Sequence, residues 1–271
     1  MDRHFNFLRG VILDWAGTTV DYGCCAPVAA FMEVFRQHAV YVSVPEIRLY
    51  MGLAKKDHIR ALCRHEAISR RWWKVHGSPP TEATVEALYA SFEPQLAKFV
   101  ARHAVPIDGV VRVVAEMRVR GLKIGATTGF SRDIMQIVAA EAARHGYAPD
   151  TWVAPEDVAD GRPAPHMIFL NAQRLGIMPY STLVKIGDTP ADIAEGRAAG
   201  TWTIGVAGTG NETGLSEENF AALAVDERVI RVRKARARLK GAAAHYVVDA
   251  LADCLPALYD IECRLAAGGE P

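Results

Sequence analysis

Short apolar segments alternate with longer helical ones along most of this chain, and this alternation is the strongest constraint on its fold. In the C-terminal two thirds, the expected strands lie at 122–126, 151–154, 182–187 and 202–206, and the segments between them have apolar residues at helical spacing. A further strand is expected at 10–13. Alternation of this kind is typical of βαβ units. The sequence therefore predicts an α/β fold in which helices cover both faces of a parallel sheet.

Residues between about 26 and 100 lack this alternation. Apolar residues recur there at helical spacing, no strong strand signal interrupts them, and Thr81 is the expected N-cap of a later helix. We therefore expect an α/β core formed by residues 1–21 and 101–271. An all-helical cap, residues 22–100, is expected to be inserted into it.

Composition and charge exclude several classes of protein. The 271 residues are 50% hydrophobic, and 31 Lys and Arg balance 31 Asp and Glu, whereas a disordered chain has low hydrophobicity and a large net charge. A nucleic-acid-binding protein usually has a basic surplus. No apolar run approaches the roughly 20 residues of a membrane span, and the N-terminal segment does not have the pattern of a signal peptide. We expect a soluble, cytoplasmic protein that binds neither nucleic acid nor membranes.

Two pairs of adjacent residues favour packing rather than chemistry. The five cysteines form an odd set without a Cys-x-x-Cys pair, which argues against a disulfide framework and against a zinc site. Cys24 and Cys25 are neighbours in sequence, and such neighbours rarely have the geometry for a disulfide. We interpret this pair, and the pair Trp72 and Trp73, as packing residues. Their packing could be within the chain or at a subunit interface.

A basic segment, residues 228–240, contains seven Lys and Arg and no acid. It could form an anion or RNA site. We interpret it instead as one solvated helix, with the acidic residues just before it balancing the helix dipole. Its expected apolar contacts are Val229, Ile230, Val232 and Leu239.

Polar residues follow three of the expected strands at the point where each strand ends. These residues are Asp14, Thr128 and Asp188. Because the carboxyl ends of parallel strands meet at one edge of a sheet, we expect the three side chains to lie together. Two carboxylates, a hydroxyl and backbone amides are what Mg²⁺-assisted phosphoryl transfer to an aspartate needs. Asp192 either supports this metal site or caps a helix.

This order of motifs resembles the haloacid dehalogenase superfamily, whose members share an Asp nucleophile, a Ser/Thr strand end, a basic residue and a distal acidic motif. The resemblance implies a Rossmann-like parallel-sheet core with an inserted cap. Ordinary phosphatases of that superfamily have a second Asp, the general acid, two residues after the nucleophile, and this chain has Ala16 there. Cleavage of an alkyl phosphate would therefore lack leaving-group protonation, which contributes about 10²–10⁴-fold in rate.

The helical insert offers a different chemistry through Lys55. A lysine amine condenses with an aldehyde or ketone to a Schiff base, which accepts electrons when a neighbouring bond breaks. If a phosphorus–carbon bond lies beside a carbonyl, Lys55 forms the iminium and Asp14 attacks phosphorus. The electrons then leave as an enamine, and no acid at Ala16 is needed. His58 lies on the same helical face as Lys55, whereas Lys56, a second candidate amine, points about 100° away.

A closer resemblance is to the phosphonoacetaldehyde hydrolase family, also called phosphonatases, and it extends over nearly the full chain. It implies Mg²⁺-dependent hydrolysis of phosphonoacetaldehyde to acetaldehyde and phosphate, through a Lys55 Schiff base and an Asp14 aspartyl-phosphate, in 2-aminoethylphosphonate degradation. It also implies a homodimer formed through the cap. The segments that carry the resemblance are 14–24, 51–58, 160–163 and 184–189.

The same resemblance implies a role for each matching residue, and it reveals one departure. Phe130 stands where the family has a tyrosine, so a phenol hydrogen bond is missing here. The implied residues are Asp14, Lys55 and His58 for catalysis; Met51, Thr128, Gly129 and Arg162 for substrate binding; and Asp14, the Ala16 backbone carbonyl and Asp188 for Mg²⁺.

Two other functions stay open on the sequence alone. One is a phosphatase or phosphomutase of the same superfamily that acts on a small phosphate ester, against which Ala16 counts. The other is a non-catalytic binding or scaffold protein, against which the intact strand-end motifs count. Single residues also have structural alternatives, because Lys55 and Arg162 could be solvated charges and His58 a structural histidine.

Overall fold

A six-stranded parallel sheet forms the centre of the computed structural model, which describes residues 4–271. The strand order is β3-β2-β1-β4-β5-β6, and all neighbours are parallel. Every residue of β1, β4 and β5 is buried, as expected for strands covered on both faces. The predicted α/β class is confirmed. The strands are β1 (Gly10–Leu13), β2 (Lys123–Thr127), β3 (Thr151–Val153), β4 (Leu183–Gly187), β5 (Trp202–Val206) and β6 (Tyr246–Val248).

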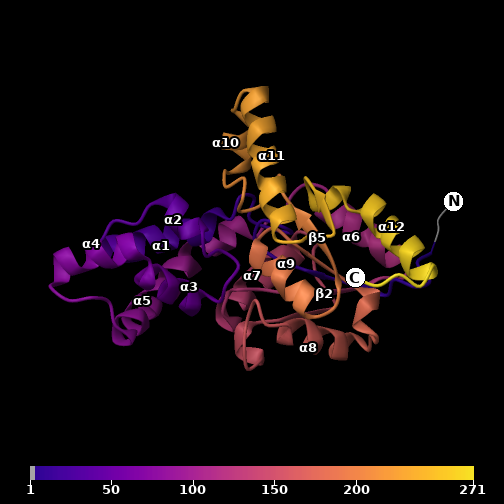
Figure 1. Cartoon of the computed structure of the whole chain (residues 1–271), viewed down its shortest axis with the longest axis horizontal. Helices are drawn as coiled ribbons and strands as arrows, with labels where there is room; N and C mark the ends of the chain where they lie inside the picture. The colour runs from indigo at the N-terminus through magenta and orange to yellow at the C-terminus, as the bar shows by residue number, and fades with distance from the viewer. Residues whose placement is uncertain (1–3) are drawn as a thin grey trace.

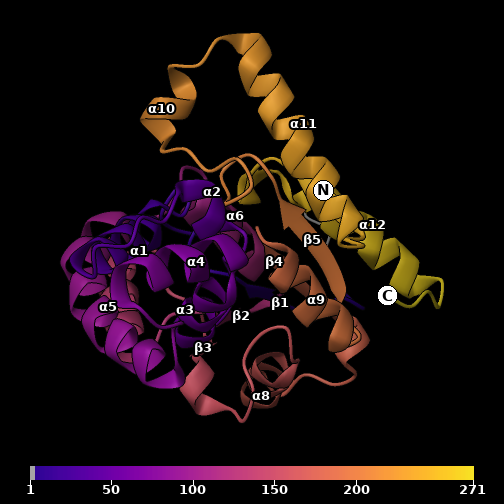
Figure 2. The same ribbon diagram turned by 60° about the vertical axis from the view of Figure 1, so that its left-hand side comes forward.

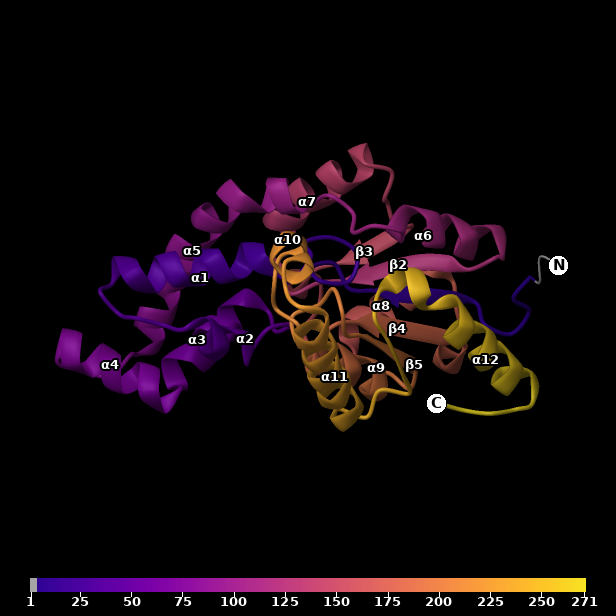
Figure 3. The ribbon, with the colours of Figure 1, turned by 90° about the horizontal axis from the view of Figure 1, so that it is seen from above.

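Alternate side chains of β1 point to opposite faces of the sheet and meet different helices. Val11 and Leu13 belong to the cluster that contains α6 (Val110–Val119), α7 (Arg132–Arg144) and α12 (Leu255–Ala266). Ile12 packs instead with α8, and α9 and α11 cover the neighbouring strands on that face. Both faces are therefore closed (Figure 3). These helices are α8 (His166–Leu175), α9 (Pro190–Ala198) and α11 (Val225–Gly241), and the short 3₁₀ turns are η1 (Pro155–Asp157), η2 (Tyr180–Thr182) and η3 (Leu251–Asp253).

Residues 25–103 contain five helices and no strand, and they lie to one side of the sheet (Figure 1). Thr81 caps the last of them as predicted, since its side chain accepts a hydrogen bond from the backbone N–H of Thr84. The last helix continues beyond the expected cap limit, and the division into core and cap stays a prediction. The five are α1 (Cys25–Gln37), α2 (Val44–Arg48), α3 (Lys55–Arg64), α4 (Glu66–His76) and α5 (Glu82–His103).

The basic segment forms one helix, as expected, but its predicted apolar contacts are partly wrong. Helix α11 and the short α10 (Glu217–Ala221) project away from the sheet as a hairpin (Figures 1 and 2). Val229 and Ile230 lie on the projecting part and are 60% and 53% exposed. Leu239 is buried and Val232 is partly buried, because only the C-terminal half of the helix reaches the sheet.

The two adjacent tryptophans that were predicted to pack differ in burial. Trp72 is buried whereas Trp73 is 58% exposed, so within this chain only Trp72 is a packing residue. All five cysteines are free.

None of the helices within residues 4–271 is long and apolar enough to cross a membrane.

Candidate active site

A small closed cavity lies between the carboxyl ends of the central strands and the five-helix region. Of the predicted site residues, only His58 is absent from its lining. The free space is ≈ 20 Å³, about the room of one water molecule, so the helices must move for a substrate to enter. The lining residues are Asp14, Ala16, Cys24, Pro27, Met51, Gly52, Lys55, Thr128, Gly129, Phe130, Arg162, Asp188 and Thr189.

A tight turn after β1 holds Asp14 at the edge of the sheet. The Trp15 carbonyl accepts hydrogen bonds from three backbone N–H groups, those of residues 18–20. Gly17 has φ +88°, and a Cβ at that position would lie 2.3 Å from Asp188 Oδ2. Only glycine therefore lets the turn approach the second carboxylate this closely.

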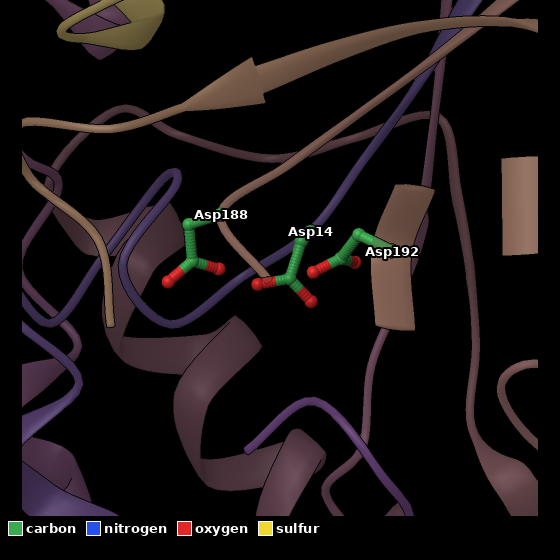
Figure 4. A group of neighbouring side chains, drawn as sticks. All are labelled: Asp14, Asp188 and Asp192. Atoms are coloured by element: carbon green, nitrogen blue, oxygen red, sulfur yellow. The ribbon is translucent and has the colours of Figure 1, made fainter. Parts of the chain in front are cut away.

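Three aspartates bring their carboxylates together at this edge (Figure 4). Ligand oxygens of Asp14, Asp188 and Asp192 all lie within 4.8 Å of one another. Burial and then the charge of Asp192 raise the pKa of Asp14, and burial and then the charge of Asp14 raise the pKa of Asp188 well above its usual value. Burial also opposes ionisation of Asp192, yet Arg162 and Lys185 hold its pKa below the usual value.

The surroundings of the three carboxylates decide which of them suit a metal ion. Asp192 forms ion pairs with Arg162 (2.9 Å) and Lys185 (3.0 Å), and its other oxygen accepts a hydrogen bond from the Thr189 hydroxyl at the N-terminus of α9. Asp188 has no cationic partner within residues 4–271. Asp14, Asp188 and the Ala16 carbonyl thus offer hard oxygen donors, and among the described residues no cation pairs with Asp188, which fits Mg²⁺. Asp192 both caps α9 and borders the site.

Arg162 is buried and pairs with three carboxylates and with the Thr127 hydroxyl. Its guanidinium is 2.8 Å from Asp14, 2.9 Å from Asp192 and 2.9 Å from Glu195. Lys185, in the middle of β4, reaches Asp192 and Glu195 as well and donates to the Thr127 hydroxyl at 2.7 Å. Arg162, the basic residue expected from the sequence, is therefore part of a buried cluster of charged side chains. We call this cluster the ionic floor; it consists of Arg162, Lys185, Asp192 and Glu195.

Lys55 faces the cavity from the opposite side, at the first position of α3. It is buried, and its Nζ lies 4.9 Å from the centroid of the Phe130 ring rather than beside a carboxylate. Burial lowers the pKa of Lys55 to about 8. Lys56, by contrast, is solvent-accessible and paired with Glu86. Of the two candidate amines, the structure brings only Lys55 to the cavity.

His58 lies one turn beyond Lys55, outside the cavity lining. Its Nε2 is 2.8 Å from the Ile47 carbonyl, and its ring packs on Phe31 with centroids 4.1 Å apart. Because a carbonyl only accepts, Nε2 carries the proton and Nδ1 is the acceptor. Nδ1 is buried and has no hydrogen-bond partner among residues 4–271. Burial and then the charge of Lys55 lower the pKa of His58, so the ring is neutral.

Comparison with known proteins identifies the family. Residues 8–200 match the family model of haloacid dehalogenase-like hydrolases. The chain belongs to this family. Phosphonoacetaldehyde hydrolase from Nitratidesulfovibrio vulgaris is 47% identical over 264 residues, 97% of this chain and 94% of the relative. The enzyme of the same name from Bacillus cereus is 44% identical over 255 residues, 94% of this chain and 97% of the relative.

A solved structure extends the comparison. The crystal structure of a phosphonoacetaldehyde hydrolase-like protein from Oleispira antarctica has a TM-score of 0.96 and 37% identity, and the match covers 99% of this chain and 98% of that one. The predicted likeness to the phosphonoacetaldehyde hydrolases is confirmed by these relatives, and so is the predicted haloacid dehalogenase-like fold.

Three residues of this haloacid dehalogenase-like hydrolase were missed or misinterpreted from the sequence. Cys24 is more than a packing residue, because its thiol lies within hydrogen-bond distance of two acceptors, the Ala16 carbonyl (3.1 Å) and Asp188 (3.2 Å). Burial and then Asp188 raise the pKa of this thiol, so it stays protonated. Lys185 and Glu195 had weak signals: a lysine inside an apolar strand, and an acid three residues after Asp192 on one helix.

Proposed function

We propose that this hydrolase cleaves the carbon–phosphorus bond of phosphonoacetaldehyde to give acetaldehyde and phosphate, in the degradation of 2-aminoethylphosphonate. The observation that carries the proposal is a buried amine, Lys55, in the same closed cavity as the carboxylate of Asp14. The lack of an acid at Ala16 supports it, because an enamine leaving group needs no such acid. The names of the relatives support the choice of substrate.

The first step in this mechanism belongs to Lys55. Its neutral amine adds to the aldehyde carbonyl, and the adduct takes up one proton as it loses water, which leaves a protonated imine. A pKa of about 8 keeps part of the amine neutral near neutral pH, which an ordinary lysine would not. The Phe130 ring covers one side of Nζ and keeps water from it.

The second step belongs to Asp14. Arg162 holds one of its oxygens at 2.8 Å, which orients the carboxylate for attack on phosphorus. The bonding pair of the C–P bond then forms the double bond of an enamine, while the π electrons of the imine move to nitrogen. Asp14 becomes an aspartyl-phosphate. Asp14, Asp188 and the Ala16 carbonyl would hold Mg²⁺, which when bound supplies positive charge to the phosphonate oxygens.

The last steps restore the protein. The enamine takes a proton at carbon. We assign this transfer to His58, whose unprotonated Nδ1 first accepts a proton from solvent and then gives it to carbon, directly or through water. Water then releases acetaldehyde from Lys55 and, separately, phosphate from Asp14. Met51, Thr128 and Gly129 line the cavity and bind the substrate. The sum is one phosphonoacetaldehyde and one water giving acetaldehyde and phosphate.

The proposal is tested by product analysis and by covalent trapping. With Mg²⁺ present, phosphonoacetaldehyde should yield equal amounts of acetaldehyde and phosphate, and a chelator should stop both. Borohydride added with the substrate should leave a reduced adduct on Lys55 and none on Lys56, as read by peptide mass spectrometry. Faster phosphate release from p-nitrophenyl phosphate than from phosphonoacetaldehyde, with no adduct, would support the phosphatase or phosphomutase alternative instead.

We also propose a cytoplasmic location and a homodimer formed through the helical region. The free state of all five cysteines supports the first, because disulfides are rare in reducing compartments. An open groove on α1 supports the second, since exposed apolar residues such as Met32 and Tyr41 line it.

A further inference from the structure

Three segments that are distant in sequence meet beside Asp188, outside the cavity. Asn211, in the loop after β5, is buried, and its backbone N–H donates to Asp188 Oδ2 at 2.6 Å. Arg48, the last residue of α2, donates to the Asn211 side-chain oxygen at 2.9 Å and to the Gly23 carbonyl at 2.8 Å. Asn211 in turn donates to the Arg48 carbonyl at 3.3 Å. The Arg48 guanidinium therefore links the five-helix region to the loop after β5, whose Asn211 donates to Asp188.

The backbone is closely packed where the Gly23 segment meets the loop after β5. Gly23 has φ +79°, and a Cβ there would lie 2.0 Å from the Leu215 carbonyl oxygen of the same loop. The Gly23 N–H also donates to the Thr209 carbonyl at 2.7 Å. The segment that leads from β1 into α1 is thus in direct contact with the loop after β5. Arg48 lies over this junction and fixes both sides of it.

These contacts join the five-helix region to the loop after β5, so a movement of the helices acts on them directly. A cavity with ≈ 20 Å³ of free space cannot admit a substrate unless the five-helix region shifts, and Arg48 shifts with it. A shift of α2 away from the loop after β5 would break the hydrogen bond from Arg48 to the Asn211 side chain. Asn211, whose backbone N–H donates to Asp188 Oδ2, would then lose its contact with Arg48.

We propose that Arg48 is a positioning residue that couples closure of the five-helix region to Mg²⁺ binding at Asp188, acting through Asn211. The inference rests on the Mg²⁺ site of the proposed function. In the closed state Asn211 holds Oδ2, which fixes the direction in which Asp188 offers Oδ1. Coupling between two equilibria is reciprocal, so Mg²⁺ also favours closure. Arg48 does not line the cavity, and within residues 4–271 no hydrogen bond or ion pair joins it to the three aspartates, so its link to Asp188 runs through Asn211.

Binding of Mg²⁺ alone, measured by calorimetry without substrate, tests the coupling. Arg48→Ala should weaken Mg²⁺ binding about tenfold. Asn211→Ala should weaken it to a similar degree, and the double variant no more than either single one, because both remove the same link. Arg48→Lys should give an intermediate loss, since a point charge cannot hold two acceptors in a fixed fork. Arg231→Ala is the matched control: Arg231 donates to the Thr213 carbonyl of the same loop from α11, without touching the five-helix region.

Hydrogen exchange gives the second readout. Mg²⁺ should slow exchange in α2 and in residues 21–24 of the wild type and of Arg231→Ala, and should leave it unchanged in Arg48→Ala. A folded Arg48→Ala protein that binds Mg²⁺ as the wild type does would overturn the proposal, and so would effects of Arg48→Ala and Asn211→Ala that simply add. If Arg48→Ala does not fold, Arg48→Lys and Asn211→Ala carry the same test. A wild type that binds Mg²⁺ but does not cleave phosphonoacetaldehyde overturns the proposed function alone.

Discussion

Arg162 and Lys55 line the same closed cavity and are both buried, yet their electrostatic surroundings are opposite. Arg162 lies within 2.9 Å of three carboxylates. Burial disfavours its charge, but the carboxylates, Asp192 foremost, outweigh burial and raise its pKa. Lys55 has no carboxylate at ion-pair distance within the described chain, and burial lowers its pKa to about 8.

The difference shows that a buried cationic side chain keeps its proton when carboxylates lie beside it, whereas the extent of its burial does not decide the outcome. Loss of hydration penalises charge at both positions, and only a close, well-oriented counter-ion repays that penalty. The sheet edge provides such counter-ions because several strand ends and the start of α9 bring acids together. The helical side provides Met51, and the loop after β2 adds the Phe130 ring. One cavity thus contains a permanent cation for an anionic group and an amine that can act as a nucleophile.

The largest expected effect comes from giving Lys55 the chemistry of Arg162. Lys55→Arg keeps the positive charge, but a guanidinium does not deprotonate and forms no Schiff base. We expect the rate of acetaldehyde formation to fall by about 10⁴-fold or more, as for loss of a covalent catalytic group. Lys56→Arg is the control, since this residue is solvent-accessible and paired with Glu86. Residual activity of Lys55→Arg above a tenth of the wild type would contradict the assignment.

The second-largest expected effect comes from removing a cation from the ionic floor, on the sheet side of the cavity. Lys185→Met leaves Asp192 and Glu195 with one cation fewer in a fully buried position. Breaking a buried ion pair on one side costs about 3–5 kcal/mol, so urea unfolding should show a loss of that size. Lys123→Met, on an exposed position of β2, should cost less than about 1 kcal/mol. Equal losses of unfolding free energy for the two variants would contradict a stabilising role of the Lys185 ion pairs.

The sheet side of this comparison could be predicted from sequence because its geometry is local. Asp14, Thr128 and Asp188 each follow a strand, and parallel strands bring their ends to one edge whatever the rest of the chain does. The helical side could not, because the contact of Lys55 with that edge depends on how α3 docks. Lys55 was assigned by resemblance to a family, and the structure then brought it to the cavity.

Other residues were missed for related physical reasons. Lys185 and Glu195 meet only because β4 and α9 pack at a particular rotation, which periodicity does not give. Cys24 reads as a small apolar residue until the turn after β1 brings its thiol to Asp188. Val229 has helical spacing, but spacing does not tell that this part of α11 projects beyond the sheet.

The smallest expected effect is a displacement in pH that separates Lys55 from ordinary lysines. Acetaldehyde with borohydride traps only the neutral amine, so the trapping rate at Lys55 follows its deprotonated fraction. Because burial lowers the pKa to about 8, the rate should rise tenfold per pH unit below that value and level off above it. An unperturbed lysine would continue to rise to about pH 10.4. Met51→Glu, which places a carboxylate on the helical side, should move the midpoint upward, because a nearby negative charge favours the ammonium. A wild-type midpoint near pH 10 would show that burial does not lower the pKa of Lys55. It would contradict both the electrostatic difference between Lys55 and Arg162 and the role of a desolvated cavity.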